Sequence, residues 1–132
     1  MQTLLRLEGR PDNVEISLVL SDDAFIQDLN RRYRNQDKPT DVLSFAQEDD
    51  PYTLGDIVIA LPTAARQAAQ AGWPLASETA LLAVHGLLHL LGYDDETLEG
   101  AQEMQRKTVQ TLLACGIVLP AGNHPFFMET RE

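Results

Sequence analysis

Apolar residues alternate with polar ones in two segments near the start of the chain. In the first segment Thr3, Leu5 and Leu7 alternate with residues 4, 6 and 8, and in the second the aliphatic residues at 14, 16, 18 and 20 alternate with residues 15, 17 and 19. Successive side chains of a strand point to opposite faces, so both segments are predicted to be strands. The short apolar run 42–45 predicts a third strand. The almost uninterrupted apolar run 54–61 predicts a fourth, covered on both faces.

The spacing becomes helical after the second predicted strand. Ser21 is a suitable N-cap, two aspartates follow it in the first turn, and apolar side chains recur at helical spacing as far as Tyr33. Further helices are predicted at about 62–71, 77–91 and 97–114. Because strands dominate the first half and helices the second, the sequence predicts an α+β fold: a four-stranded mixed sheet with helices packed on it.

The length of the chain, 132 residues, predicts one domain spanning 1–132, with a tail at 120–132. The tail carries Phe126-Phe127-Met128, which either folds back onto the core or acts as a docking segment. No apolar run reaches the roughly 18 residues of a membrane span. The first residues also lack the pattern of a signal peptide, so a cytoplasmic location is expected.

Charge is unevenly distributed along the chain. The net charge of −10 argues against a general nucleic-acid coat protein. Four of the ten basic residues nevertheless fall within one eight-residue segment: Arg31, Arg32, Arg34 and Lys38. The cluster is either a solvated helix end, where cations complement the helix dipole, or a site for phosphate.

The residues with the clearest chemical meaning are His85 and His89. Positions four apart lie one above the other on a helix, so both imidazoles can reach one metal ion. The surrounding leucines predict a buried helix, in which two histidines on one face are better explained by a shared ion than by separate polar networks. Gly92 is predicted to end this helix in the left-handed conformation, so that the chain turns back towards the histidines.

A third metal ligand is expected just beyond this turn. Asp95 is the preferred candidate, with Asp94 and the tail residue His124 as alternatives. Asp95 also has a non-metal interpretation, in which it helps to cap the helix that begins near Thr97. Three protein ligands with one open position are typical of a catalytic zinc site. The pattern therefore predicts a hydrolase with one zinc ion per chain, held on an active-site helix.

Three segments resemble the YbeY endoribonuclease family of bacterial rRNA-maturation factors. The run from His85 to Asp95 is similar to its H-G-x-L-H-L-x-G-Y-D-H motif, and residues 29–45 resemble L-N-x-x-Y-R-x-x-D-K-P-T-D-V-L-S-F. Residues 54–59 are similar to its L-G-D-I-x-I strand. The resemblance implies a zinc ion held by three histidines. His85 and His89 match the first two ligands, whereas Asp95 stands where the family has histidine.

The resemblance also implies an activity: single-strand-specific cleavage of RNA in maturation of the 16S rRNA 3′ end and in ribosome quality control. The arginine of the family's Y-R pair corresponds to Arg34, which would clamp a phosphate as a catalytic residue. A small-subunit ribosomal protein and an assembly GTPase are implied as partners. The general base is left open among Asp41, Asp56 and Asp94, which are candidates by residue type alone.

Two other functions compete with this interpretation. The ligand spacing i, i+4, i+10 also resembles the metzincin proteases, which carry glutamate directly after the first histidine as general base. Gly86 occupies that position here and cannot accept a proton. The second alternative is a ribosome-assembly binding factor whose metal is structural.

Overall fold

The computed structural model of the chain describes residues 2–9, 14–47, 49–50 and 52–117. The described elements follow in the order α1 (Gln2–Leu7), β1 (Glu15–Ser21), α2 (Asp23–Arg34), β2 (Val42–Ala46), β3 (Thr53–Ala60), α3 (Leu61–Ala71), α4 (Leu75–Leu90) and α5 (Leu98–Ala114). The α+β class is thereby confirmed. The tail with Phe126-Phe127-Met128, and with it His124, lies outside the described residues.

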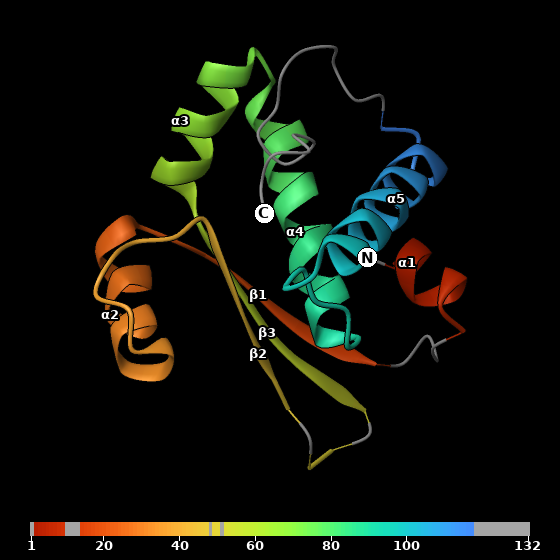
Figure 1. Cartoon of the computed structure of the whole chain (residues 1–132), viewed down its shortest axis with the longest axis horizontal. Helices are drawn as coiled ribbons and strands as arrows, with labels where there is room; N and C mark the ends of the chain where they lie inside the picture. Colours follow the sequence, from red (N-terminus) through yellow and green to blue (C-terminus); the bar gives the residue numbers. More distant parts are fainter. Residues whose placement is uncertain (1, 10–13, 48, 51, 118–132) are drawn as a thin grey trace.

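Within these residues the sheet has three strands in the order β1-β3-β2. β3 pairs with β1 in parallel and with β2 antiparallel, so the sheet is mixed as predicted. Figure 1 shows α2 on one side of the sheet and α1, α4 and α5 on the other. Side chains of β3 alternate between these layers: Ile57 and Ile59 join the core beneath α4, whereas Val58 and Ala60 pack with Ile26 of α2.

The prediction of a fourth strand at residues 3–7 is wrong, because this segment is helix α1. Leu4 and Leu5 are adjacent, and both are buried in the same core at 1% and 3% exposure, while Leu7 is 47% exposed. Adjacent side chains of a strand face opposite ways, so a helix is the conformation that buries this pair together. The alternation at 3, 5 and 7 was misleading because Leu4, between two of those positions, is also apolar.

The start of α2 also differs from the prediction by one residue. Ser21 ends β1, and Asp22 is the N-cap, with its Oδ1 accepting a hydrogen bond from the Phe25 amide at 2.8 Å. A carboxylate near the first turn also interacts favourably with the helix dipole.

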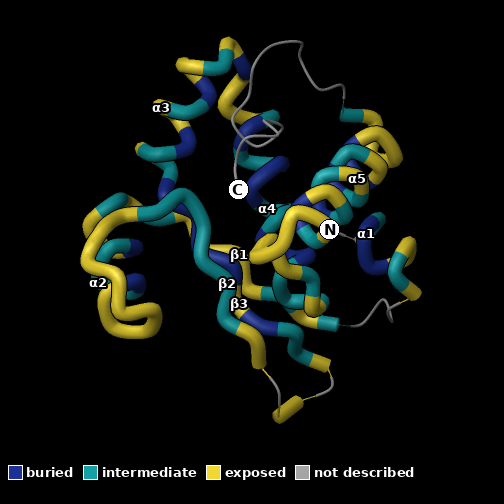
Figure 2. The backbone as a smooth tube through the Cα atoms, in the orientation of Figure 1, coloured by how far each residue is buried: buried dark blue, intermediate teal, exposed yellow. Residues whose placement is uncertain are grey.

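α4 is the central helix of the structure. It packs against β2, β3, α3 and α5. Figure 2 shows buried stretches along α4, whereas the outer turns of α2 and α5 are exposed. Five of its aliphatic side chains belong to the main core: Leu81, Leu82, Val84, Leu87 and Leu88. Side chains on α4 are therefore held in place by packing on several sides.

No helix among the described residues is both long and apolar enough to cross a membrane.

Candidate functional site

His85 and His89 lie on the same face of α4, one turn apart, as their spacing predicted. The Nε2 atoms of the two rings are 3.1 Å apart, and the Nε2 atom of His85 is 3.9 Å from Oδ2 of Asp95. Each of the three residues offers one ligand atom, and these atoms lie within 4.8 Å of one another. Two ligands about 2.0–2.1 Å from a tetrahedral zinc ion are roughly 3.3 Å apart, so the donors fit one ion after small adjustments.

Asp95 reaches the histidines because the chain turns sharply after α4. Gly92 has φ = 101°, a conformation that side chains with a Cβ rarely adopt. Its amide donates to the His89 carbonyl at 3.1 Å, and the Tyr93 amide donates to the Leu88 carbonyl at 3.0 Å. The predicted helix end at Gly92 is thus confirmed, and the carbonyls of the last turn are satisfied by the turn itself.

The geometry distinguishes between two of the candidate third ligands. Asp95 belongs to the cluster with the histidines. Oδ1 of Asp94 instead accepts a hydrogen bond from the Glu96 amide at 3.2 Å, so this carboxylate orders the turn. The cap of α5 is Thr97, whose Oγ1 accepts from the Gly100 amide at 2.9 Å. The capping interpretation of Asp95 is therefore wrong for this helix.

A partly buried polar network holds the turn against the body of the protein. The hydroxyl of Tyr93 donates to Oε1 of Glu8 at 2.6 Å, and Nζ of Lys107 donates to Oε2 of Glu8 at 2.9 Å. The hydrogen bond with Glu8 is the main reason why the pKa of Tyr93 and that of Lys107 are both raised. These hydrogen bonds connect the segment after α1, the turn after α4 and helix α5. In the turn, the connection is made by Tyr93, two residues before Asp95.

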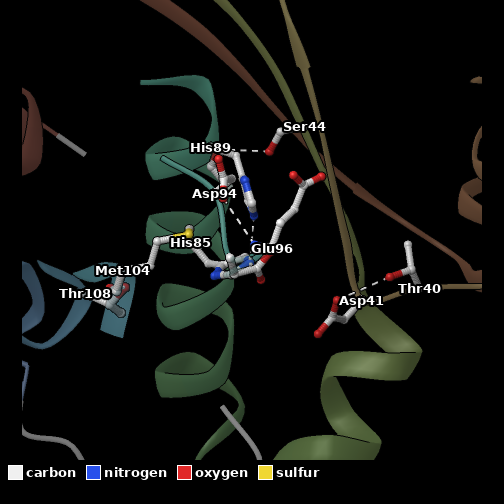
Figure 3. Close-up of polar contacts among 11 residues, drawn as sticks. Thr40, Asp41, Ser44, His85, His89, Asp94, Glu96, Met104 and Thr108 are labelled. Atoms are coloured by element: carbon white, nitrogen blue, oxygen red, sulfur yellow. Dashed lines mark hydrogen bonds and ion pairs between the residues drawn. The ribbon is translucent and has the colours of Figure 1, made fainter. Parts of the chain in front are cut away.

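The three donors open into a cleft of about 720 Å³ between α4 and β2. Figure 3 shows His85 and His89 on α4, with Asp41 and Ser44 on the facing wall. The chemically important lining residues come from distant parts of the sequence: Arg34, Asp41, Ser44, His85, His89 and Asp95. Arg34 therefore shares one cleft with the candidate ligands.

Arg34 is held at the rim of this cleft by two contacts. Its Nη2 donates a hydrogen bond to the Ser44 carbonyl at 2.5 Å, and its Cζ atom lies 5.1 Å from the centroid of the Phe45 ring. Both contacts suit a guanidinium, because an N–H group donates to the carbonyl while the positive charge lies over the aromatic ring.

The rest of the basic cluster is arranged differently. Arg31 and Arg32 both pair with Asp28, at 2.6 and 3.5 Å, on the exposed side of α2. The carboxylate offsets part of their charge, and exposed pairs of this kind contribute little to stability. Arg34 is the member of the cluster that lines the cleft.

The candidates for a general base also separate in space. Asp41 is half-buried and lines the cleft. Asp56 shares the face of β3 that packs towards α2, and it lines a different groove beside β1. Asp56 is therefore on the wrong side of the sheet to exchange a proton with a group held by the histidines.

Gly86 explains how closely α4 approaches the sheet. A Cβ added at this position would lie 2.7 Å from Cγ2 of Ile57 and 3.0 Å from Oγ of Ser44. The Ser44 hydroxyl also donates to the Gly86 carbonyl at 2.9 Å. Residue 86 thus faces the sheet, and the proton-accepting glutamate that metzincins carry at this position would be directed into packed core.

Two features of the site were missed from the sequence. Glu78 is fully buried and lines the cleft two helical turns before His85, a position that its seven-residue spacing could have indicated. Ser44 ties β2 to α4 through a pairing that spans 42 residues of sequence, for which no local pattern exists.

Comparison with known proteins relates this chain to endoribonucleases. A family model described as endoribonuclease YbeY matches residues 1–116. Endoribonuclease YbeY of Moorella thermoacetica is 48% identical over 129 aligned residues, covering 89% of this chain and 83% of the relative. The protein of the same name from Pelotomaculum thermopropionicum is 50% identical over 119 residues, covering 84% of this chain and 78% of the relative.

A solved structure is similar as well. The solution structure of TM1509 from Thermotoga maritima aligns with a TM-score of 0.57 at 25% identity. The alignment covers 87% of this chain and 78% of that one. The similarity therefore extends over most of both folds.

Proposed function

This chain belongs to the endoribonuclease YbeY family, and we propose that it is a zinc-dependent endoribonuclease that cuts unpaired RNA in a single domain spanning residues 1–132. The observation that carries the proposal is that two kinds of functional group line the same cleft. A three-donor cluster on and after α4 and the guanidinium of Arg34 both line it. A phosphodiester needs both kinds of group, since its cleavage develops charge on the phosphoryl oxygens.

His85, His89 and Asp95 would hold the ion, one per chain. Two imidazole nitrogens and one carboxylate oxygen form a common donor set for catalytic zinc, and three protein ligands leave a position open. When bound, zinc would lower the pKa of water to about 7 and stabilise negative charge on phosphoryl oxygens. The carboxylate at Asp95 replaces the third histidine of the family motif without changing the number of donors.

Arg34 would bind the scissile phosphate or its neighbour. The Ser44 carbonyl and the Phe45 ring both contact the guanidinium, which restricts its orientation. A restricted guanidinium loses less conformational entropy when it binds, and its remaining N–H groups can donate to two phosphate oxygens. Arg31, Arg32 and Lys38 would add a general attraction for the RNA backbone.

Asp41 is our candidate for the proton acceptor. Its carboxylate lies on the wall of the cleft facing the histidines and accepts a hydrogen bond from the Thr40 hydroxyl at 3.4 Å. In that place it can take a proton from the attacking oxygen, whether that oxygen belongs to water or to the RNA 2′-hydroxyl.

Peptide hydrolysis is disfavoured by the same geometry. The metzincin mechanism needs a glutamate directly after the first histidine, and this chain has Gly86 there, packed against Ile57. A Cβ at this position would lie against Ile57 and Ser44 of the sheet. The similarity to proteases is therefore limited to the spacing of the ligands.

The biological role that we propose is rRNA processing in the cytoplasm, at the 3′ end of 16S rRNA, and ribosome quality control. A small-subunit ribosomal protein and an assembly GTPase are the proposed protein partners. The net charge of −10 supports a basic partner, because complementary potentials steer association. Family membership supports the RNA substrate.

The proposal is tested by cleavage of a short unpaired RNA with and without a chelator. His85→Ala, purified identically, controls for contaminating nuclease. We expect cleavage by the wild-type protein, loss on chelation, recovery on adding zinc, and no recovery in His85→Ala. A protein that binds zinc and RNA but leaves the RNA intact would instead support an assembly factor with a structural metal.

A further inference from the structure

An aromatic pair lies next to Arg34, on the other side of the edge strand β2. Tyr33, near the end of α2, is 61% exposed. Its ring centroid is 5.4 Å from that of Phe45, with the two planes at 71°. Phe45 also carries the Arg34 guanidinium, 5.1 Å from its centroid. The Phe45 ring therefore contacts both the Tyr33 ring and the Arg34 guanidinium, which lines the cleft.

Core packing explains Phe45 but not Tyr33. Phe45 packs with the cluster of α2 and β3, whereas most of Tyr33 is in contact with solvent. Other large side chains of this chain are also exposed, for example Tyr52 at 57%, so exposure alone has no functional meaning. Tyr33 differs in its surroundings, because it is fixed by an edge contact with Phe45 and lies beside the basic residues that end α2.

An exposed ring held beside a phosphate-binding cation is the usual way in which proteins bind unpaired nucleotides. The cation holds the backbone and the base stacks on the ring, and every base has a face that can stack. A base inside an A-form helix is already stacked and paired, so the same ring cannot receive it. An aromatic platform of this kind therefore selects for single strands without reading sequence.

We propose that Tyr33 is a specificity-determining residue that stacks on the base of a nucleotide adjacent to the phosphate held by Arg34. This inference rests on the proposed RNA substrate and assigns a structural cause to its single-stranded character. Tyr33 and Arg34 are consecutive in sequence, and the Phe45 ring contacts both. The backbone of a bound strand would then cross β2, with one phosphate at the cleft and the neighbouring base on Tyr33.

The test combines removal of the ring with removal of a base. A short unpaired RNA with one cleavage site is prepared intact and as a series with one abasic nucleotide at each position. The wild-type protein, Tyr33→Ala and Tyr33→Phe are compared on the whole series by kcat/KM. Tyr52→Ala is the matched control, since it removes an equally exposed tyrosine from outside the basic cluster.

If the ring stacks on a base, one abasic position near the cut should lower wild-type kcat/KM by about tenfold. Tyr33→Ala should lower cleavage of the intact RNA by a similar factor, and the abasic change at that position should then cost nothing more. Tyr33→Phe should restore most of the loss because it keeps the ring, and Tyr52→Ala should behave as wild type. The same abasic profile in the wild-type protein and Tyr33→Ala would overturn the proposal.

The same RNAs are also bound to the His85→Ala variant, with and without Tyr33→Ala, so that the inference does not depend on cleavage. If removal of the Tyr33 ring and removal of the base at one position each lower the affinity but the two losses do not add, base stacking on Tyr33 is supported even if the chain cuts no RNA. Additive losses would overturn it whatever the nuclease activity. A lowered melting temperature for Tyr33→Ala without any position-specific effect would show that the ring only covers Phe45, which also overturns the proposal.

Discussion

Replacing Gly86 with alanine tests the close contact on which the site is built. The added Cβ would lie 2.7 Å from Cγ2 of Ile57, a side chain with 0% exposure on the central strand. Ordinary carbon contacts are about 3.5–4.0 Å, so the Ile57 side chain, α4 or β3 must shift by roughly 1 Å. The second neighbour, Oγ of Ser44 at 3.0 Å, holds the Gly86 carbonyl and restricts the same movement.

Two opposing effects set the size of the change. Overpacking a close-packed interior costs about 1–3 kcal/mol, whereas alanine is better than glycine inside a helix by about 1 kcal/mol. We therefore expect a net loss of about 1–2 kcal/mol, seen as a melting temperature lower by a few degrees. Gly86→Glu should be far less stable and should show no peptidase activity, because its carboxylate would meet the sheet.

Thermal and urea denaturation, followed by circular dichroism, measure this change. Ala65→Gly on the exposed side of α3 is a control for helix propensity alone, with an expected loss of about 1 kcal/mol. In an Ile57→Ala background the cost of Gly86→Ala should shrink or reverse, because the opposing atoms are gone. A Gly86→Ala protein more stable than the wild type would refute the close packing, and with it the structural argument against a protease.

The remaining predictions concern the ligand, the clamp and the network behind them. Asp95→Asn should weaken zinc affinity far more than it weakens folding, whereas Asp95→His should keep the metal; equal zinc affinity in Asp95→Asn would remove this residue from the site. Arg34→Ala should leave zinc content and melting temperature nearly unchanged and should lower the rate of cleavage at least about tenfold. Arg34→Lys should recover little of that rate, because an ammonium cannot reproduce the planar contact. A wild-type cleavage rate in Arg34→Ala would contradict the phosphate-binding role of Arg34. The raised pKa of Lys107 means that its stabilisation by Glu8 is complete below about pH 10 and is lost as pH rises through the folded-state value. The stability difference between the wild type and Glu8→Gln in urea should therefore shrink between pH 9 and pH 12, and a difference that grows would contradict the assignment.

The parts of the structure that could be predicted from the sequence are those determined by local residue patterns. β1 and α2 were predicted from a regular apolar spacing, and β3 was predicted from an almost uninterrupted apolar run. The metal cluster could also be predicted, because His85, His89 and Asp95 lie within eleven consecutive residues and Gly92 supplies the turn before Asp95.

What the sequence did not show depends on contacts between distant segments. α1 was misassigned because a short segment with two neighbouring leucines takes its conformation from the core that it covers. The hydrogen bonds of Glu8 connect residues that are separated by 85 and 99 positions in the sequence. The Ser44 contact with α4 connects residues that are separated by 42 positions. Tyr33 fits the helical period of α2 yet stays exposed, since the period cannot tell where the buried face ends.

The central claim is that the cleft formed by α4 and β2 cuts RNA only when His85, His89 and Asp95 hold a metal ion. The most direct measurement is a titration of metal-free protein with zinc, in which bound metal and the rate of RNA cleavage are recorded on the same samples. We predict that the rate rises in proportion to bound zinc and levels off at about one ion per chain, and that the His85→Ala, His89→Ala double variant gains neither. Full cleavage by the metal-free protein, or full zinc occupancy in the double variant, would contradict the account.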